Sequence, residues 1–170
     1  MKSHISVNKK KLTRFVALIV IAGAGYLFLH GGNGARLLHF NQAPKINSSD
    51  TPTVTFDSVS EPVDVALADT DAEREQGLSG RPGLAPNEGM LFIFDTPGRP
   101  AFWMKDMLFP LDIIWFSSDW HIVDITQNLP PESYPSTVSP IADTTYVLEV
   151  PAGFAVAHHL KINQSATFKK

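Results

Sequence analysis

Two carboxylates lie inside segments that are otherwise apolar. Asp112 is in LDIIWF, residues 111–116, and in an extended chain it shares a face with Ile114 and Phe116. A carboxylate in that position is partly buried, so it must be paired or hydrogen-bonded. Two roles remain open for Asp112: a structural ion pair or bonds to loop amides, or a carboxylate that binds a ligand or acts as a general acid or base.

Glu149 belongs to the alternating segment YVLEV, residues 146–150, on the face opposite Tyr146 and Leu148. Half-buried strands often show such a carboxylate to water. If Asp112 and Glu149 instead converge in one cleft, they form the carboxylate pair of a hydrolase, which needs a separation of roughly 5–9.5 Å. The sequence does not decide between these alternatives.

Three further residues are candidates for ligand contacts. Lys105 ends the segment FWMK, residues 102–105, where its ammonium group can lie over an aromatic ring or at the rim of a pocket. Trp103 is in the same segment, and Arg81 lies in the turn-rich stretch 80–89, where it is a candidate for an anion contact. Each also has a structural interpretation, as a solvated lysine, a core tryptophan or a surface-loop arginine.

Several kinds of site are not indicated. The chain has no cysteine, which excludes disulfides, thiolate metal sites, a thiol nucleophile and a lipidated cysteine. His158 and His159 are adjacent, whereas helical zinc pairs are four residues apart, so we predict no metal site. Ser136 and Ser139 lack the context of a nucleophile elbow. The sequence predicts no cofactor and identifies no catalytic residue, and it leaves open whether the protein is an enzyme, with a non-enzymatic role favoured.

The elements that must position these residues are short, because 13 prolines and 11 glycines interrupt the chain. A capping box from Thr70 to Glu73 predicts a helix that Gly77 ends. Strands are expected at residues 63–67, 90–94, 102–104, 111–116, 121–127, 146–150 and 166–168, and a second short helix at 154–160. We treat residues 128–140 as a long surface excursion. The pattern predicts one compact α+β domain, mainly β, with a curled sheet or small barrel and two short helices.

Ahead of this domain we expect an N-terminal hydrophobic helix. An apolar run at residues 15–29 follows four basic residues, so residues 1–32 are predicted to be a signal anchor that crosses the membrane through residues 12–32. Residues 33–53 are expected to be a flexible linker and residues 54–170 the globular domain. The N-terminus is then cytoplasmic and the domain periplasmic or on the cell surface. Cleavage after the small residues 22–24 would instead make the protein secreted.

Charge is distributed unevenly along the chain. The first 49 residues carry seven bases and no acid, a net charge of +7. From position 50 onward, 17 acids face seven bases, a net charge of −10. A domain with this excess of acid repels nucleic acid and anionic lipid headgroups, so we predict no nucleic-acid partner.

Six sequence blocks occur in an order typical of a known family. They are Glu73-Arg74-Glu75-x-Gly77-Leu78, Arg81, GMLFIF from Gly89, FWMK from Phe102, PLD from Pro110, and YVLEVPAG from Tyr146. Across about residues 63–168 the chain resembles domain-of-unknown-function family 192, whose members are often membrane-attached or secreted. The resemblance implies a compact β-rich α+β fold and brings no established activity, cofactor or catalytic residue. The family usually continues FWMK with Asn-Thr, where this chain has Asp106-Met107.

These features together predict a membrane-anchored, extracytoplasmic binding or accessory module of unknown ligand. Its site is expected near FWMK, PLD and YVLE, and its partner is an envelope polymer, a small ligand or another protein. The alternative is a hydrolase that acts on a cell-envelope polymer through Asp112 and Glu149. The two hypotheses differ in whether Asp112, Glu149 and Lys105 line a single pocket.

Overall fold

The computed structural model describes residues 51–170. The predicted anchor and nearly all of the predicted linker lie outside these residues. Within the described part of the chain, no helix is both long and apolar enough to span a bilayer.

The described chain forms nine strands, two short α-helices and one 3-10 turn, η1 (Pro131–Ser133). The strands are β1 (Thr53–Phe56), β2 (Val63–Ala68), β3 (Glu88–Gly98), β4 (Phe102–Trp103), β5 (Leu111–Phe116), β6 (Ile122–Leu129), β7 (Thr137–Val138), β8 (Thr144–Pro151) and β9 (Ala166–Lys169). The helices are α1 (Asp71–Gln76) and α2 (Phe154–Ala157). The fold is therefore mainly β with two short helices, as the sequence predicts.

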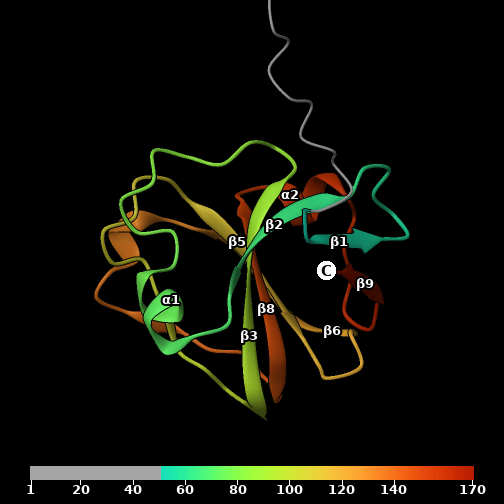
Figure 1. Cartoon of the computed structure of the whole chain (residues 1–170). Helices are drawn as coiled ribbons and strands as arrows, with labels where there is room; N and C mark the ends of the chain where they lie inside the picture. Colours follow the sequence, from blue (N-terminus) through green and yellow to red (C-terminus); the bar gives the residue numbers. More distant parts are fainter. Residues whose placement is uncertain (1–50) are drawn as a thin grey trace, which may run out of the picture. The chain divides into compact units, whose positions relative to one another are not determined.

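Seven strands form one curled, half-barrel sheet in the order β6-β5-β8-β3-β2-β1-β9, and β4 pairs with β7 in a separate ribbon. Strands β3 and β8 run side by side near the middle of the sheet, with α1 beyond β3 (Figure 1). Only the β2–β3 pair is parallel, and α1 makes the crossover between these two strands. The crossover brings the end of α1 close to β3.

Helix α1 begins and ends as its sequence predicts. The Thr70 hydroxyl accepts a hydrogen bond from the Glu73 amide, while the Glu73 carboxylate accepts one from the Thr70 amide. Gly77 ends the helix with φ +48°, a conformation that residues with a Cβ adopt at a cost. The chain therefore turns sharply at Gly77 and lies against Phe92 of β3, whose ring would be 3.5 Å from an added Cβ.

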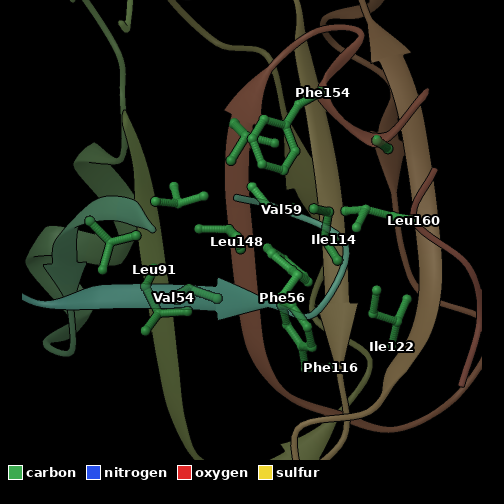
Figure 2. Close-up of a cluster of buried hydrophobic side chains, with 14 residues drawn as sticks. Val54, Phe56, Val59, Leu91, Ile114, Phe116, Ile122, Leu148, Phe154 and Leu160 are labelled. Atoms are coloured by element: carbon green, nitrogen blue, oxygen red, sulfur yellow. The ribbon is translucent and has the colours of Figure 1, made fainter. Parts of the chain in front are cut away.

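The sheet is apolar on both faces. The inner-face cluster takes side chains from all seven strands, and Figure 2 shows how Phe56, Ile114, Phe116 and Leu148 converge there. The outer-face cluster gathers Phe92, Ile113, Trp115 and Val147 with residues of the α1 segment and of the β4–β7 ribbon. Successive residues of a strand project to opposite faces, so β5 and β8 contribute to both clusters.

The first and last strands of the domain are neighbours. Strand β1 pairs with β9 in antiparallel register, from Thr53 opposite Lys169 to Phe56 opposite Ala166. Just before β9, an isolated bridge joins Ser165 to His121, at the start of β6. The two outermost strands of the sheet, β6 and β9, are therefore linked at one corner.

Two strands were not predicted from the sequence. Strand β1 begins at Thr53, the last residue of the predicted linker, and β7 lies inside the predicted surface excursion 128–140. Both are very short, and both are held by partners distant in sequence, β9 and β4. The second helix is also shorter than predicted, because the helical conformation ends at Ala157.

Candidate functional site

A cavity of about 250 Å³ opens on the outer face of the sheet. It is bounded by the end of α1, by strand β3, and by the segment that leads into β4. Strand β8 contributes one residue, Glu149, to its lining. Its lining consists of Arg74, Glu75, Gln76, Gly77, Leu78, Ser79, Phe92, Phe94, Pro100, Ala101, Phe102, Trp103, Met107 and Glu149. Most of this lining is apolar or aromatic, and the α1 end supplies nearly all of the polar groups.

Glu149 is the buried acid of this cavity. It lies on β8 between two neighbours in the sheet, opposite Met90 of β3 and Ile113 of β5. Directly paired residues project to the same face, so the Glu149 side chain lies on the outer face with Ile113. Only 6% of Glu149 is exposed. Of the two alternatives for Glu149, exposure to water does not hold, because the α1 end and residues 100–107 cover this face.

Nothing within residues 51–170 neutralises the Glu149 carboxyl group. None of the ion pairs there includes it. Burial raises the pKa of Glu149 from 4.5 to about 8, with no opposing contribution from a cation or a hydrogen bond. At neutral pH the site therefore presents a mostly protonated, uncharged carboxyl group to an apolar cavity.

Asp112 is also buried, with 0% exposed, but its environment differs. Its two carboxylate oxygens accept hydrogen bonds from the backbone amides of Asn128, at 2.7 Å, and Ala155, at 2.8 Å. Ala155 lies in the first turn of α2, where backbone amides have no partner within the helix. Asp112 thus holds the end of β6 and the start of α2 against β5.

The two candidate carboxylates lie on opposite faces of the sheet. Asp112 pairs with Val150 and belongs to the inner face with Ile114, as its position in LDIIWF indicates. Glu149 pairs with Ile113 on the outer face. The strands and their side chains separate the two carboxyl groups, so they do not face one another across a cleft as a glycosidase pair does.

Of the two candidates in the segment FWMK, Trp103 lines the cavity and Lys105 lies next to Trp103. Trp103 lines the cavity and is 49% exposed, with its ring centroid 6.3 Å from that of Tyr134. The Lys105 ammonium group lies 6.0 Å from the centre of the Trp103 ring. FWMK and YVLE thus meet at one site, while Asp112 of PLD lies apart from it.

The two arginines of the first helix region have different positions. Arg74 lies in the cavity wall, where its guanidinium donates to the backbone oxygens of Asp69 and Ile93 and pairs with Asp71 at 2.7 Å. Three hydrogen bonds of its guanidinium, which carries five N–H donors, are therefore made within the protein. Arg81 is exposed and lines a second, more open depression together with residues of β2 and α1.

Of the residues that line the cavity, only Trp103 and Glu149 were among the site residues predicted from the sequence. Phe92 and Phe94 were predicted only as strand residues. Met90 of β3 pairs with Glu149 of β8, and alternate residues of a strand share a face, so Phe92 and Phe94 lie on the same face as Glu149. Met107, at the position where the family usually has threonine, also lines the cavity. The pairing of β3 with β8 was the missing information.

Comparison with a family model matches residues 53–168 to DUF192, described as an uncharacterized ACR. Comparison with curated proteins returns no match.

Two solved structures resemble the described domain. A protein of unknown function from Novosphingobium aromaticivorans has 32% identity and a TM-score of 0.63, covering 69% of this chain and 83% of its own. A protein from Sinorhizobium meliloti, described as a candidate transcription regulator, has 30% identity and the same TM-score, covering 69% of this chain and 91% of its own. The family match spans most of the chain and agrees with the fold, and the chain therefore belongs to the DUF192 family.

Proposed function

We propose that the protein is a membrane-anchored, extracytoplasmic binding module whose ligand enters the cavity beside Glu149. The observation that carries this proposal is a buried carboxyl group without a partner in a cavity that opens to the surface. A buried polar group without a partner is costly to the folded state. Such groups persist at functional sites, where a ligand completes their interactions.

The dimensions of the cavity limit the ligand. About 250 Å³ is less than the roughly 300–1,000 Å³ of sites for drug-sized molecules. The ligand, or the part of it that enters, is therefore a single ring or a compact branched group. Aromatic walls around one polar group favour an apolar body with one polar end.

A nucleic-acid ligand does not suit this domain. Residues 50–170 carry a net charge of −10, and the cavity mouth includes the exposed carboxylate of Glu75. Phosphate groups would be repelled from this surface. We therefore assign no nucleic-acid partner to the chain.

Ligand binding is testable by blocking the cavity. A mixed set of small cationic, neutral and anionic compounds is screened by ligand-detected NMR against the full-length chain in a nonionic detergent. We expect at least one class to bind the wild type and to lose binding in Ala101→Trp, since Ala101 lines the cavity and is exposed. Ala157→Trp, at an exposed alanine outside the cavity, is the matched control and should bind normally. Absence of binding by all classes, or equal binding by both variants, would contradict the proposal.

The extracytoplasmic location has its own test. The basic residues ahead of the apolar run favour retention of the N-terminus in the cytoplasm. A reporter that fluoresces only in the cytoplasm should therefore stay dark when fused after Lys170, and be bright when fused ahead of Met1. A bright signal from the C-terminal fusion would show that the domain is not translocated.

A further inference from the structure

We propose that the cavity binds a small organic ammonium ion, with the cation beside the Glu149 carboxylate and its alkyl groups against the aromatic wall. The inference deepens the proposed function, on which it rests. It follows from the buried carboxyl group in the cavity lining, from the aromatic rings of the same lining, and from the lack of an ion-pair partner for Glu149 among residues 51–170.

Glu149 supplies the polar contact. It is more than nine-tenths buried, lies in the cavity lining, and has no ion-pair partner among residues 51–170. A carboxylate in an apolar site is stabilised by an opposite charge within about 4–6 Å. A cationic ligand therefore forms an ion pair with Glu149, and this attraction offsets the cost of ionising the acid in the apolar cavity.

Aromatic side chains supply the second contact. Phe92, Phe94, Phe102 and Trp103 all line the cavity, and the first three form an edge-to-face array in which neighbouring ring centroids are 4.9 and 6.5 Å apart. The faces of aromatic rings attract cations, and aromatic cages are a recurrent solution for alkylated ammonium groups. Two of these rings already have a cationic side chain of the protein close to them. Arg74 lies 5.4 Å from the centre of Phe94, and Lys105 lies 6.0 Å from that of Trp103.

Other ligand charges fit less well. Three hydrogen bonds of the Arg74 guanidinium are already made to Asp69, Asp71 and Ile93, and a bound anion would oppose ionisation of Glu149. A neutral polyol would need several polar partners. However, the Gln76 amide group donates to the Ser79 carbonyl and the Ser79 hydroxyl donates to the Lys105 carbonyl. Glu149 is thus the one buried acid of a mostly apolar cavity, which suits a ligand with one charged centre and an apolar shell.

Two pairs of isosteric compounds test the charge of the ligand directly. Choline is compared with 3,3-dimethylbutan-1-ol, and butylammonium with butan-1-ol, by calorimetric titration of the full-length chain in a nonionic detergent. In at least one pair we expect the ammonium compound to bind at least about tenfold more tightly than its neutral isostere. Glu149→Gln should remove that preference, and Trp103→Ala should weaken binding without removing it. Ile141→Ala, at an exposed apolar residue outside the cavity, is the control and should bind as the wild type does.

Proton release is the signature that separates an ion pair from simple packing. Because the pKa of Glu149 is about 8, binding of a cation at pH 7 should release close to one proton per ligand. The released proton is measured by repeating the titration in buffers with different ionisation enthalpies. Affinity should rise with pH up to about pH 8. The other charged groups of the cavity are Arg74 and Glu75, both on α1, and the β3 and β4 segments contribute none.

The outcomes distinguish the two proposals. If a neutral isostere binds as tightly as its ammonium partner and Ala101→Trp blocks both, the cavity is a ligand site but not one for cations. If the ammonium compound binds without releasing a proton, Glu149 is not its partner and the inference is overturned. If no compound of either pair binds the wild type, the ammonium inference is wrong, and the wider compound screen decides whether the cavity binds anything.

Discussion

Replacement of Glu149 by glutamine is expected to stabilise the unliganded protein by about 3 kcal/mol at pH 7. The pKa of Glu149 is 4.5 in its ordinary state and about 8 in the fold. Between pH 4.5 and about pH 8, the folded chain keeps a proton on Glu149 that the unfolded chain releases. The free energy of unfolding therefore falls by about 1.4 kcal/mol for each unit by which the pH rises in this range. The full loss, about 5 kcal/mol, is reached above pH 8. Glutamine has the shape of the protonated acid and does not ionise, so Glu149→Gln escapes this loss.

The measurement is denaturant unfolding of the full-length chain at pH 5, 7 and 9. The difference between Glu149→Gln and the wild type should be small at pH 5 and largest at pH 9. Glu61→Gln, at an exposed acid between β1 and β2, is the matched control and should parallel the wild type. A Glu149→Gln protein that is less stable than the wild type at all three pH values would show that the carboxyl group has a stabilising partner.

Replacement of Asp112 by alanine is expected to have the opposite effect, a loss of about 3–5 kcal/mol. Each of its two hydrogen bonds joins a backbone amide to a carboxylate, and such bonds contribute roughly 1.5–3 kcal/mol. The Ala155 amide is buried, so Asp112→Ala would leave it without an acceptor at the start of α2. Total stability of a domain of this size is roughly 5–15 kcal/mol, so the variant is near the limit of folding.

Asp112→Asn separates the structural role from a functional one. Asparagine keeps one acceptor oxygen and places an amide donor against the other backbone amide, so we expect an intermediate loss. Urea unfolding midpoints of wild type, Asp112→Asn and Asp112→Ala should decrease in that order. Asp57→Ala, at an exposed acid, should leave the midpoint nearly unchanged. An Asp112→Asn variant as stable as the wild type would point to strain at this position and favour a role in ligand binding.

The contrast between these two acids shows what could be predicted from sequence. Strand parity placed Asp112 with Ile114 and Phe116 and placed Glu149 opposite Leu148, and both assignments are confirmed. Parity depends only on neighbouring residues. The partners of Asp112 depend on tertiary structure, because Ala155 is 43 residues away in the chain.

The covering of Glu149 could not be predicted for a related reason. Its face is covered by the α1 crossover and by residues 100–107, which precede it in the sequence by more than 40 positions. The position of α1 follows from the parallel pairing of β2 with β3, and residues 100–107 include β4, which pairs with β7. No local pattern indicates either pairing. The capping box, in contrast, is complete within four residues, and it was predicted correctly.

The pairing of β1 with β9 has a consequence for how the domain is made. Thr53 pairs with Lys169, so the sheet lacks its β9 edge until residues 166–169 have been made. Contacts between such distant residues carry a large loop-closure entropy and slow the folding of a domain. During synthesis, Val54 and Phe56 stay without their β9 neighbours, Phe168 and Ala166, until that strand is available. The seven-stranded sheet would thus be complete only once residues 166–169 of β9 had emerged.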